Sequence, residues 1–147
     1  MSNSLLPKQA VINEVFSENF DSEVVLIDSV PVSPGDEFNL VFEEKCSNWR
    51  QGVWFGVDGL IEVEGEQNAS MRIWEDNSPD MIRIKVIEAD GFLHIYNIWD
   101  RGFGPSSQAH TSGMIVEEFG VTRRYRCQSI NVQPSFDDIT FRIEKMT

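Results

Sequence analysis

Short runs in which apolar and polar residues alternate recur from residue 23 onward, and this period of two limits the fold more than any other feature of the chain. The clearest run is MIRIKVIE at 81–88, which places Ile82, Ile84 and Val86 on one face and Arg83 and Lys85 on the other. Successive side chains of a β-strand point to opposite faces of the sheet, so this run predicts a half-buried strand. The other predicted strands lie at 24–30, 38–43, 52–57, 60–66, 70–75, 92–99, 113–119, 121–129 and 137–144.

These runs predict an all-β domain built from an antiparallel sheet. Asp58-Gly59 and Asp90-Gly91 each separate two runs, and Asp-Gly is a strong signal for a tight hairpin because glycine accepts the positive φ of such turns. No stretch shows a sustained helical period, although residues 5–20 fit either a short N-terminal helix or an edge strand. About nine or ten antiparallel strands in one core predict a jelly-roll-like β-sandwich, with a partly open barrel as the second choice.

Composition favours one domain and disfavours binding to nucleic acids or membranes. A chain of 147 residues with 41% hydrophobic content can form a single core over residues 1–147. The net charge of −12 repels phosphates and anionic lipids. Residues 1–73 carry 4 basic and 13 acidic side chains, against 8 and 11 in residues 74–147. Any basic patch is therefore expected to come from the second half.

The N-terminus and the cysteines indicate a reducing compartment. No basic segment followed by an apolar run opens the chain, and no apolar run approaches the roughly 20 residues of a membrane span. A cytoplasmic location is expected. Cys46 and Cys127 match no metal-binding spacing, and we expect two free thiols, with Cys127 in the core.

The residues argue against most kinds of catalytic site, so no catalytic residue, metal ion or cofactor is predicted. His94 and His110 are far apart and lack the additional ligands that a cupin-type metal site needs. The chain has no G-x-S-x-G nucleophile motif and no phosphate-binding glycine loop. The segment EDNSPD at 75–80 has oxygens that suit Ca²⁺, but a turn explains it better, since the regular ligand spacing is missing. An enzyme whose site combines distant residues stays open as an alternative.

The outward positions of several predicted strands combine aromatic and basic side chains. If these strands share a sheet, the face can hold a carbohydrate or another small polar ligand, because aromatic rings stack on the C–H face of a sugar while basic groups donate hydrogen bonds to its hydroxyls. The candidate residues on the strands are Trp54, Arg72, Trp74, Arg83, His94, Tyr96 and Arg124. The structural alternative is that the N-terminal segment covers the rings and the arginines pair with surface carboxylates.

A long connection, loop 100–112 within NIWDRGFGPSSQAHTSGM (97–114), completes the predicted site. It exceeds the usual two to six residues, and such connections in compact domains are often functional. Asp100, Arg101 and His110 are expected to close over one edge of the face. The alternative is a simple crossover between two sheets. Near the C-terminus, FDDITFRIE (136–144) is similar to the ending of galactose-binding-like carbohydrate modules, a resemblance that implies a β-sandwich.

Two classes of function follow from these patterns. The first is a non-catalytic domain that holds a small polar ligand on the aromatic and basic face. The second is a cytoplasmic protein-interaction domain of the antidote type, whose acidic N-terminal half attracts a basic protein partner. An exposed sheet face can also pack against a second copy of the chain, so a homodimer is a further alternative.

Overall fold

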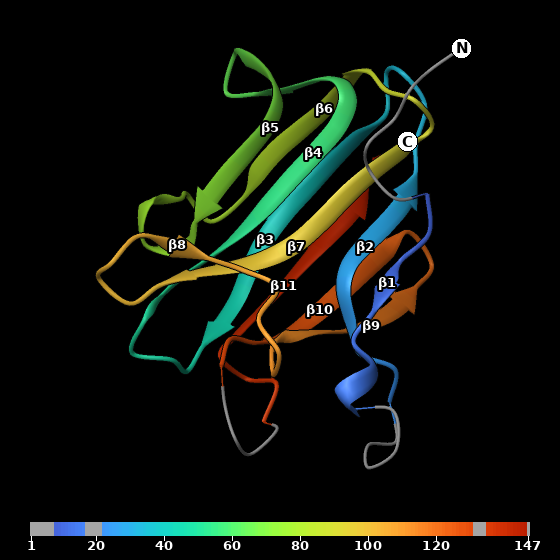
Figure 1. Cartoon of the computed structure of the whole chain (residues 1–147). Helices are drawn as coiled ribbons and strands as arrows, with labels where there is room; N and C mark the ends of the chain where they lie inside the picture. The colour runs from blue at the N-terminus through green and yellow to red at the C-terminus, as the bar shows by residue number, and fades with distance from the viewer. Residues whose placement is uncertain (1–7, 17–21, 131–134, 147) are drawn as a thin grey trace.

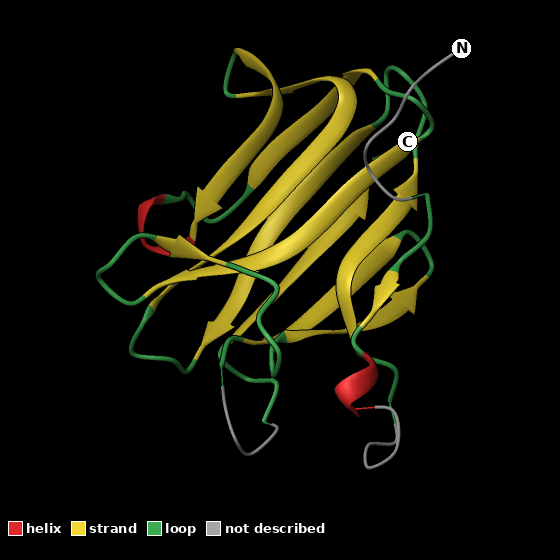
Figure 2. Cartoon of the chain, viewed as in Figure 1, coloured by secondary structure: helices red, strands yellow, loops and turns green. Residues whose placement is uncertain are grey.

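The computed structural model describes residues 8–16, 22–130 and 135–146, and nearly all of its regular structure is β-strand (Figure 2). The strands are β1 (Val11–Ile12), β2 (Val25–Pro31), β3 (Glu37–Lys45), β4 (Arg50–Val63), β5 (Glu66–Trp74), β6 (Ile82–Glu88), β7 (Phe92–Asp100), β8 (Pro105–Ser106), β9 (Gly113–Phe119), β10 (Thr122–Gln128) and β11 (Ile139–Lys145). The two helical segments are single 3₁₀ turns at Glu14–Phe16 and Glu75–Asn77. The predicted all-β, antiparallel class is confirmed. No helix in the described part of the chain has the length and apolar character needed to cross a membrane.

The sheet closes into a barrel, so the predicted jelly-roll sandwich is wrong. The order around the barrel is β2, β9, β10, β11, β3, β6, β4 and β7, and β7 pairs back with β2 (Figure 1). Two separate sheets would require β2 to belong to one of them, yet β2 bonds to β9 through Val25 and to β7 through residues 28–31. Strand β5 lies outside the ring and pairs with β4, while the two-residue strands β1 and β8 pair with β2 and β7.

Strand β4 contains the sharp bend that allows closure. Strand β5 occupies one edge of β4 along both of its halves, and the other edge pairs first with β7 at residues 50–56 and then with β6 at 60–63. The predicted hairpin at Asp58-Gly59 is therefore wrong, since both residues lie inside β4, where the register shifts between Gly56 and Ile61. Gly59 has φ +148°, and a Cβ there would lie 2.1 Å from the carbonyl oxygen of Glu88. Only glycine fits this position, because the chain forms a bulge with positive φ here and the backbone of Glu88 lies too close for a side chain.

The hairpins also differ from the prediction elsewhere. The two-residue turn between β4 and β5 is Glu64-Gly65, with φ of +53° and +82°. Asp90-Gly91 does make a turn, and it links β6 to β7. In the described chain these two strands are not hydrogen-bonded to each other; each pairs instead with a different part of β4. The Asp-Gly signal correctly predicted positive φ at the glycines but not which strands are partners.

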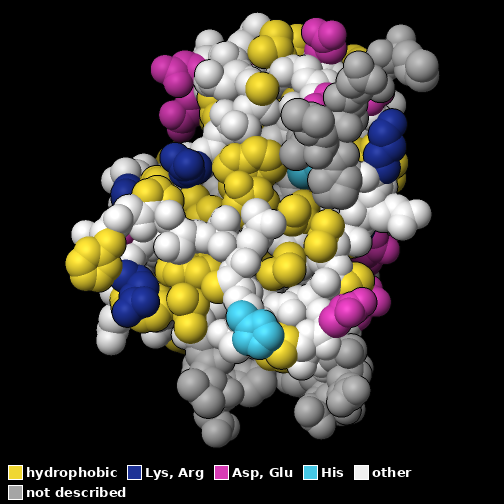
Figure 3. All heavy atoms as spheres, viewed as in Figure 1, with side chains coloured by type: hydrophobic (Ala, Val, Ile, Leu, Met, Phe, Trp, Pro, Cys, Tyr) yellow, Lys and Arg dark blue, Asp and Glu magenta, His cyan; other side chains and the backbone are white. Residues whose placement is uncertain are grey.

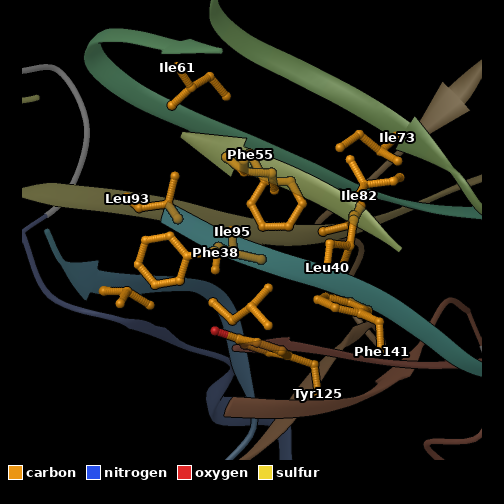
Figure 4. Close-up of a cluster of buried hydrophobic side chains, with 14 of the residues drawn as sticks. Phe38, Leu40, Phe55, Ile61, Ile73, Ile82, Leu93, Ile95, Tyr125 and Phe141 are labelled. Carbon is orange, nitrogen blue, oxygen red and sulfur yellow. The ribbon is translucent and has the colours of Figure 1, made fainter. Parts of the chain in front are cut away.

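The alternating residues fill the barrel as predicted. Ile84 and Val86 are fully buried, as are Tyr125 and Cys127 on β10, and the interior side chains form one continuous cluster (Figure 4). Cys127 and the exposed Cys46 are both free thiols, as expected.

The described part of segment 5–20 combines both predicted alternatives in short form. Residues 11–12 form the edge strand β1 and residues 14–16 form one 3₁₀ turn, whereas residues 5–7 and 17–20 lie outside the described chain. Phe16 packs edge-on against Phe136, with ring centroids 5.4 Å apart. This segment therefore packs against the C-terminal part of the chain.

Replacing Gly59 tests the bend in β4. We expect Gly59→Ala to lower the free energy of unfolding by about 3 kcal/mol, because the new Cβ adds left-handed strain and overlaps the Glu88 carbonyl. Gly65→Ala is the matched control: its φ is also positive but its surroundings are open, so it should cost only about 1 kcal/mol. Urea unfolding measures both. Equal losses for the two variants would contradict the steric role of Gly59.

Candidate functional site

Four of the predicted ligand-binding residues share one outer wall of the barrel, formed by β5, β4 and β7. Trp54 on β4 lies directly opposite Arg72 on β5 and Tyr96 on β7, and Trp74 lies opposite Gly52. We call Trp54, Arg72, Trp74 and Tyr96 the aromatic face. Figure 3 views the molecule from this side and shows hydrophobic side chains gathered here with Lys and Arg side chains beside them. The structure thus brings together residues from three predicted strands.

Trp54 and Tyr96 form a stacked pair at the centre of the aromatic face. Their ring centroids are 4.6 Å apart and their planes differ by 14°, and both side chains are half-buried. Gly56 makes room for the indole, since a Cβ at that position would lie 2.1 Å from the ring of Trp54. The pair is fixed before any ligand arrives, because cross-strand register and a missing side chain hold it in place.

The loop after β7 approaches this pair. Ser107 of this loop lies close enough to the Tyr96 hydroxyl to lower the pKa of the phenol. Burial raises the pKa of Tyr96, while the charge of Arg72 and the nearby Ser107 act in the opposite direction. The net upward shift keeps the phenol neutral near pH 7. Tyr96 therefore offers a neutral hydroxyl beside a guanidinium.

Trp74 is covered on one side by a cation. The guanidinium of Arg50 lies 4.4 Å from the centre of the Trp74 ring. Arg50 also donates through Nε to both carboxylate oxygens of Asp76, at 3.0 and 2.9 Å. The cation–π contact holds the indole of Trp74 in a fixed orientation. Asp76 belongs to the predicted turn at 75–80, and its bond to Arg50 supports the structural explanation of that turn.

Loop 101–112 lies along the edge of β7 before it continues to β9. Its strand β8 pairs with Trp99 and Asp100, which places the loop beside the aromatic face. Arg101 lies over the ring of Trp49 at 4.8 Å, and Phe103 at the tip is 93% exposed. The predicted crossover between two sheets is wrong, because the loop joins β7 to β9 of one closed barrel. Its role at the edge of a ligand site stays a prediction.

Asp100 and His110 have structural contacts within this loop. The Asp100 carboxylate accepts hydrogen bonds from the backbone N–H of Gly102 at 2.7 Å and of Gly104 at 3.2 Å. The carbonyl oxygen of His110 accepts a hydrogen bond from the Asn13 side chain, and the imidazole is exposed. Asp100 thus holds the turn of the loop, an Asx-type role.

Arg83 and Arg124 point outward as predicted, but the barrel carries them to other walls. Arg83 on β6 donates to the side-chain oxygen of Asn39 and pairs with Glu37. Arg124 on β10 lies between Glu43 and Glu117. Alternation identifies the outward face of each strand but not its partners: β10 lies four places from β4 in the barrel order, and Arg83 is directed toward Asn39 and Glu37 on β3.

His94 follows the predicted outward alternation yet is only 2% exposed. Its Nδ1 lies 3.1 Å from the hydroxyl of Ser29 on β2, and its ring is stacked beside Phe92. Burial lowers the pKa of His94, and the charges of Asp58 and Asp28 oppose this shift. The buried, neutral imidazole therefore links β7 to β2 at the pairing that closes the barrel.

One polar cluster inside the barrel was not predicted from the sequence. Arg123 on β10 has the same alternation as Tyr125 and Cys127, so it points inward, where its partner is Asp28 on β2. The signal was available, since an inward arginine on a core strand requires a buried acceptor. Elsewhere in the described chain, no three His, Cys, Asp or Glu side chains are grouped to hold a metal ion.

The buried imidazole predicts a pH dependence of stability. Because the pKa of His94 is lower in the folded state than the unfolded value of about 6.5, the unfolded chain binds more protons as the pH falls below that value. The free energy of unfolding should be fully maintained above pH 6.5 and decrease below it, and His94→Gln should flatten this decrease. Urea unfolding between about pH 5.5 and 7.5 measures the effect. His110→Gln, at an exposed histidine, is the control; a flattening in this variant instead would contradict the assignment.

Searches with known family models, curated protein sequences and solved protein structures produced no match to this chain. The function proposed below therefore depends on the geometry of the side chains alone.

Proposed function

We propose that this protein is a non-catalytic binding domain that holds a carbohydrate, or a polar ligand of similar shape, on the aromatic face. The supporting observation is a contrast among the arginines. Every arginine of the chain pairs with a carboxylate except Arg72 and Arg101, judged over the described residues. Both exceptions lie on the wall that carries the stacked aromatic pair or in the loop at its edge.

An unpaired arginine is unexpected on a chain with net charge −12, because carboxylates are abundant on its surface. The exposed guanidinium of Arg72 keeps its N–H donors for water or for a ligand. It lies opposite Trp54 in the sheet register and close enough for its charge to lower the pKa of Tyr96. Donors and flat rings are therefore adjacent on the surface.

This combination matches the chemistry of a sugar ring. The C–H face of the ring packs on an aromatic surface, and its hydroxyl groups accept hydrogen bonds from a guanidinium. The stacking of Trp54 on Tyr96 and the space left by Gly56 fix the ring orientations in advance, which reduces the entropy lost on binding. Two carboxylates on this side, Asp76 and Asp100, are occupied by Arg50 and by the loop backbone, which favours binding over acid–base catalysis.

A titration with short oligosaccharides of glucose, galactose, N-acetylglucosamine and glucuronic acid tests the proposal. We expect at least one series to bind, and Trp54→Ala and Arg72→Ala to weaken that binding by about tenfold, equivalent to roughly 1.4 kcal/mol for a lost stacking or hydrogen-bonding contact. Arg126→Ala is the matched control, because Arg126 lies on the opposite side of the ring order and pairs with Glu117. Isothermal calorimetry measures the dissociation constants. Equal weakening in all three variants, or no binding by any sugar, would contradict the proposal.

A protein partner is the second candidate, and Phe103 is the observation that favours it. Phe103 is 93% exposed and lies two residues from Arg101, which stacks on Trp49. Exposed aromatic and arginine side chains of this kind are typical anchors of protein interfaces. The same titration distinguishes the two candidates. Phe103→Ala should leave sugar affinity unchanged if the ligand lies on the aromatic face, whereas a protein partner identified by crosslinking should lose affinity.

A further inference from the structure

Asp28, Tyr125 and Arg123 form a polar cluster inside the largely apolar barrel. It is separate from the buried hydrogen bonds that join Gln51 to Ser129 and Asn97 to the carbonyl oxygen of Gln128. Asp28 is 3% exposed and Tyr125 is fully buried among the core side chains. Figure 4 shows the Tyr125 hydroxyl pointing away from Phe141, the ring on which Tyr125 stacks. A carboxylate in this setting requires strong partners, because desolvation of an unpaired charge is very costly.

The partners of Asp28 are all provided. The Tyr125 hydroxyl donates to Oδ2 at 2.6 Å, and Arg123 Nη2 donates to Oδ2 at 3.0 Å and to Oδ1 at 3.3 Å. Burial is the main cause of a strongly raised pKa at Tyr125, so the phenol stays a neutral donor. Both oxygens of Asp28 are therefore occupied from within the barrel, and a ligand cannot replace Arg123 at this position without leaving a buried charge.

The other side of the Arg123 guanidinium faces a cavity. The cavity measures about 330 Å³, within the range of small-molecule sites. Its apolar lining includes Val30 on β2, Phe38 on β3 and Ile143 on β11, all interior residues of the barrel, together with Val121 at the β9–β10 turn. The cavity thus lies at the mouth of the barrel and is distinct from the aromatic face.

The partner on this side of Arg123 is replaceable. Nη1 of Arg123 pairs with Glu118, whose side chain is 66% exposed. Because Glu118 is exposed, water competes for its carboxylate, so a carboxylate that arrives with an apolar chain can displace it. Lys145 provides a second cation in the lining, although it pairs with Asp36.

We infer that the barrel mouth binds small monocarboxylates with a short apolar chain, with the carboxylate on Arg123 in place of Glu118 and the chain against Val30, Phe38, Val121 and Ile143. The apolar lining supplies the affinity through burial of the chain. The cation at its inner end selects the charge of the ligand. This site is independent of the proposed carbohydrate site, since it shares no residue with the aromatic face.

Octanoate is the probe for the test, and octylammonium is the matched ligand of opposite charge. In ¹H–¹³C spectra we expect saturable methyl shifts of Val30, Val121 and Ile143 with octanoate and none with octylammonium. Arg123→Ala is a poor variant because it leaves Asp28 buried without its cation. Glu118→Gln is better, since it removes the competing carboxylate at an exposed position, and it should raise octanoate affinity by about twofold to fivefold. Glu117→Gln, the neighbouring residue that pairs with outward arginines, should leave the affinity unchanged.

Three results would overturn the inference. One is the absence of saturable octanoate shifts in these methyl groups. Another is equal binding of octanoate and octylammonium, which would remove the role of Arg123. The third is unchanged or weaker octanoate binding by Glu118→Gln, because the inference requires Glu118 to compete with the ligand.

Discussion

The architecture depends on one strand having two partners along one edge. Strand β4 pairs with β7 through its first half and with β6 through its second, and the bend at Gly59 makes both pairings geometrically compatible. Without this bend, β6 and β7 would compete for one straight edge and the ring would stay open at that point. The bend also leaves the opposite edge of β4 to β5, which lies outside the ring and extends the wall on which the aromatic face forms.

Arginine has two different roles in this barrel, and the difference bears on function. On the wall formed by β3, β11, β10 and β9, Arg124, Arg126 and Arg142 alternate with Glu43 and Glu117 in a surface network. Such pairs contribute little stability each, but they balance the charge of neighbouring strands. Arg72 has no such carboxylate in the described chain and lies beside aromatic rings. The same residue type thus completes the surface on one wall and exposes hydrogen-bond donors on another.

Local pattern predicted the strands and their inward and outward positions well, because the period of two is a property of the chain itself. It placed Trp54, Arg72, Trp74 and Tyr96 on outward positions that the structure does bring together. Closure was not predictable in this way. The pairing of β2 with β7 is made through ordinary strand residues that carry no distinctive signal.

The errors have the same origin in long-range pairing. Asp58-Gly59 has the sequence of a hairpin turn, but a glycine is required here because the backbone of Glu88, 29 residues away, lies too close for a side chain. His94 lies on the outward side of its strand, yet the neighbouring strand buries it against Ser29. The ion pair between Arg123 and Asp28 joins strands at opposite ends of the chain. Each of these contacts depends on which strands become neighbours. Local sequence patterns do not determine strand pairing, because it results from the fold as a whole.

The central claim, that the outer wall of β5, β4 and β7 is the ligand-binding surface, is tested most directly by the indole signals of the four tryptophans. Trp54 and Trp74 lie on this wall, whereas Trp99 is fully buried within the barrel and serves as an internal reference. ¹H–¹⁵N spectra recorded during the oligosaccharide titration should show progressive shifts of the Trp54 and Trp74 indole N–H signals and a constant Trp99 signal. Binding that shifts Trp99 and leaves Trp54 and Trp74 unchanged, or a titration in which no indole signal moves, would contradict the account.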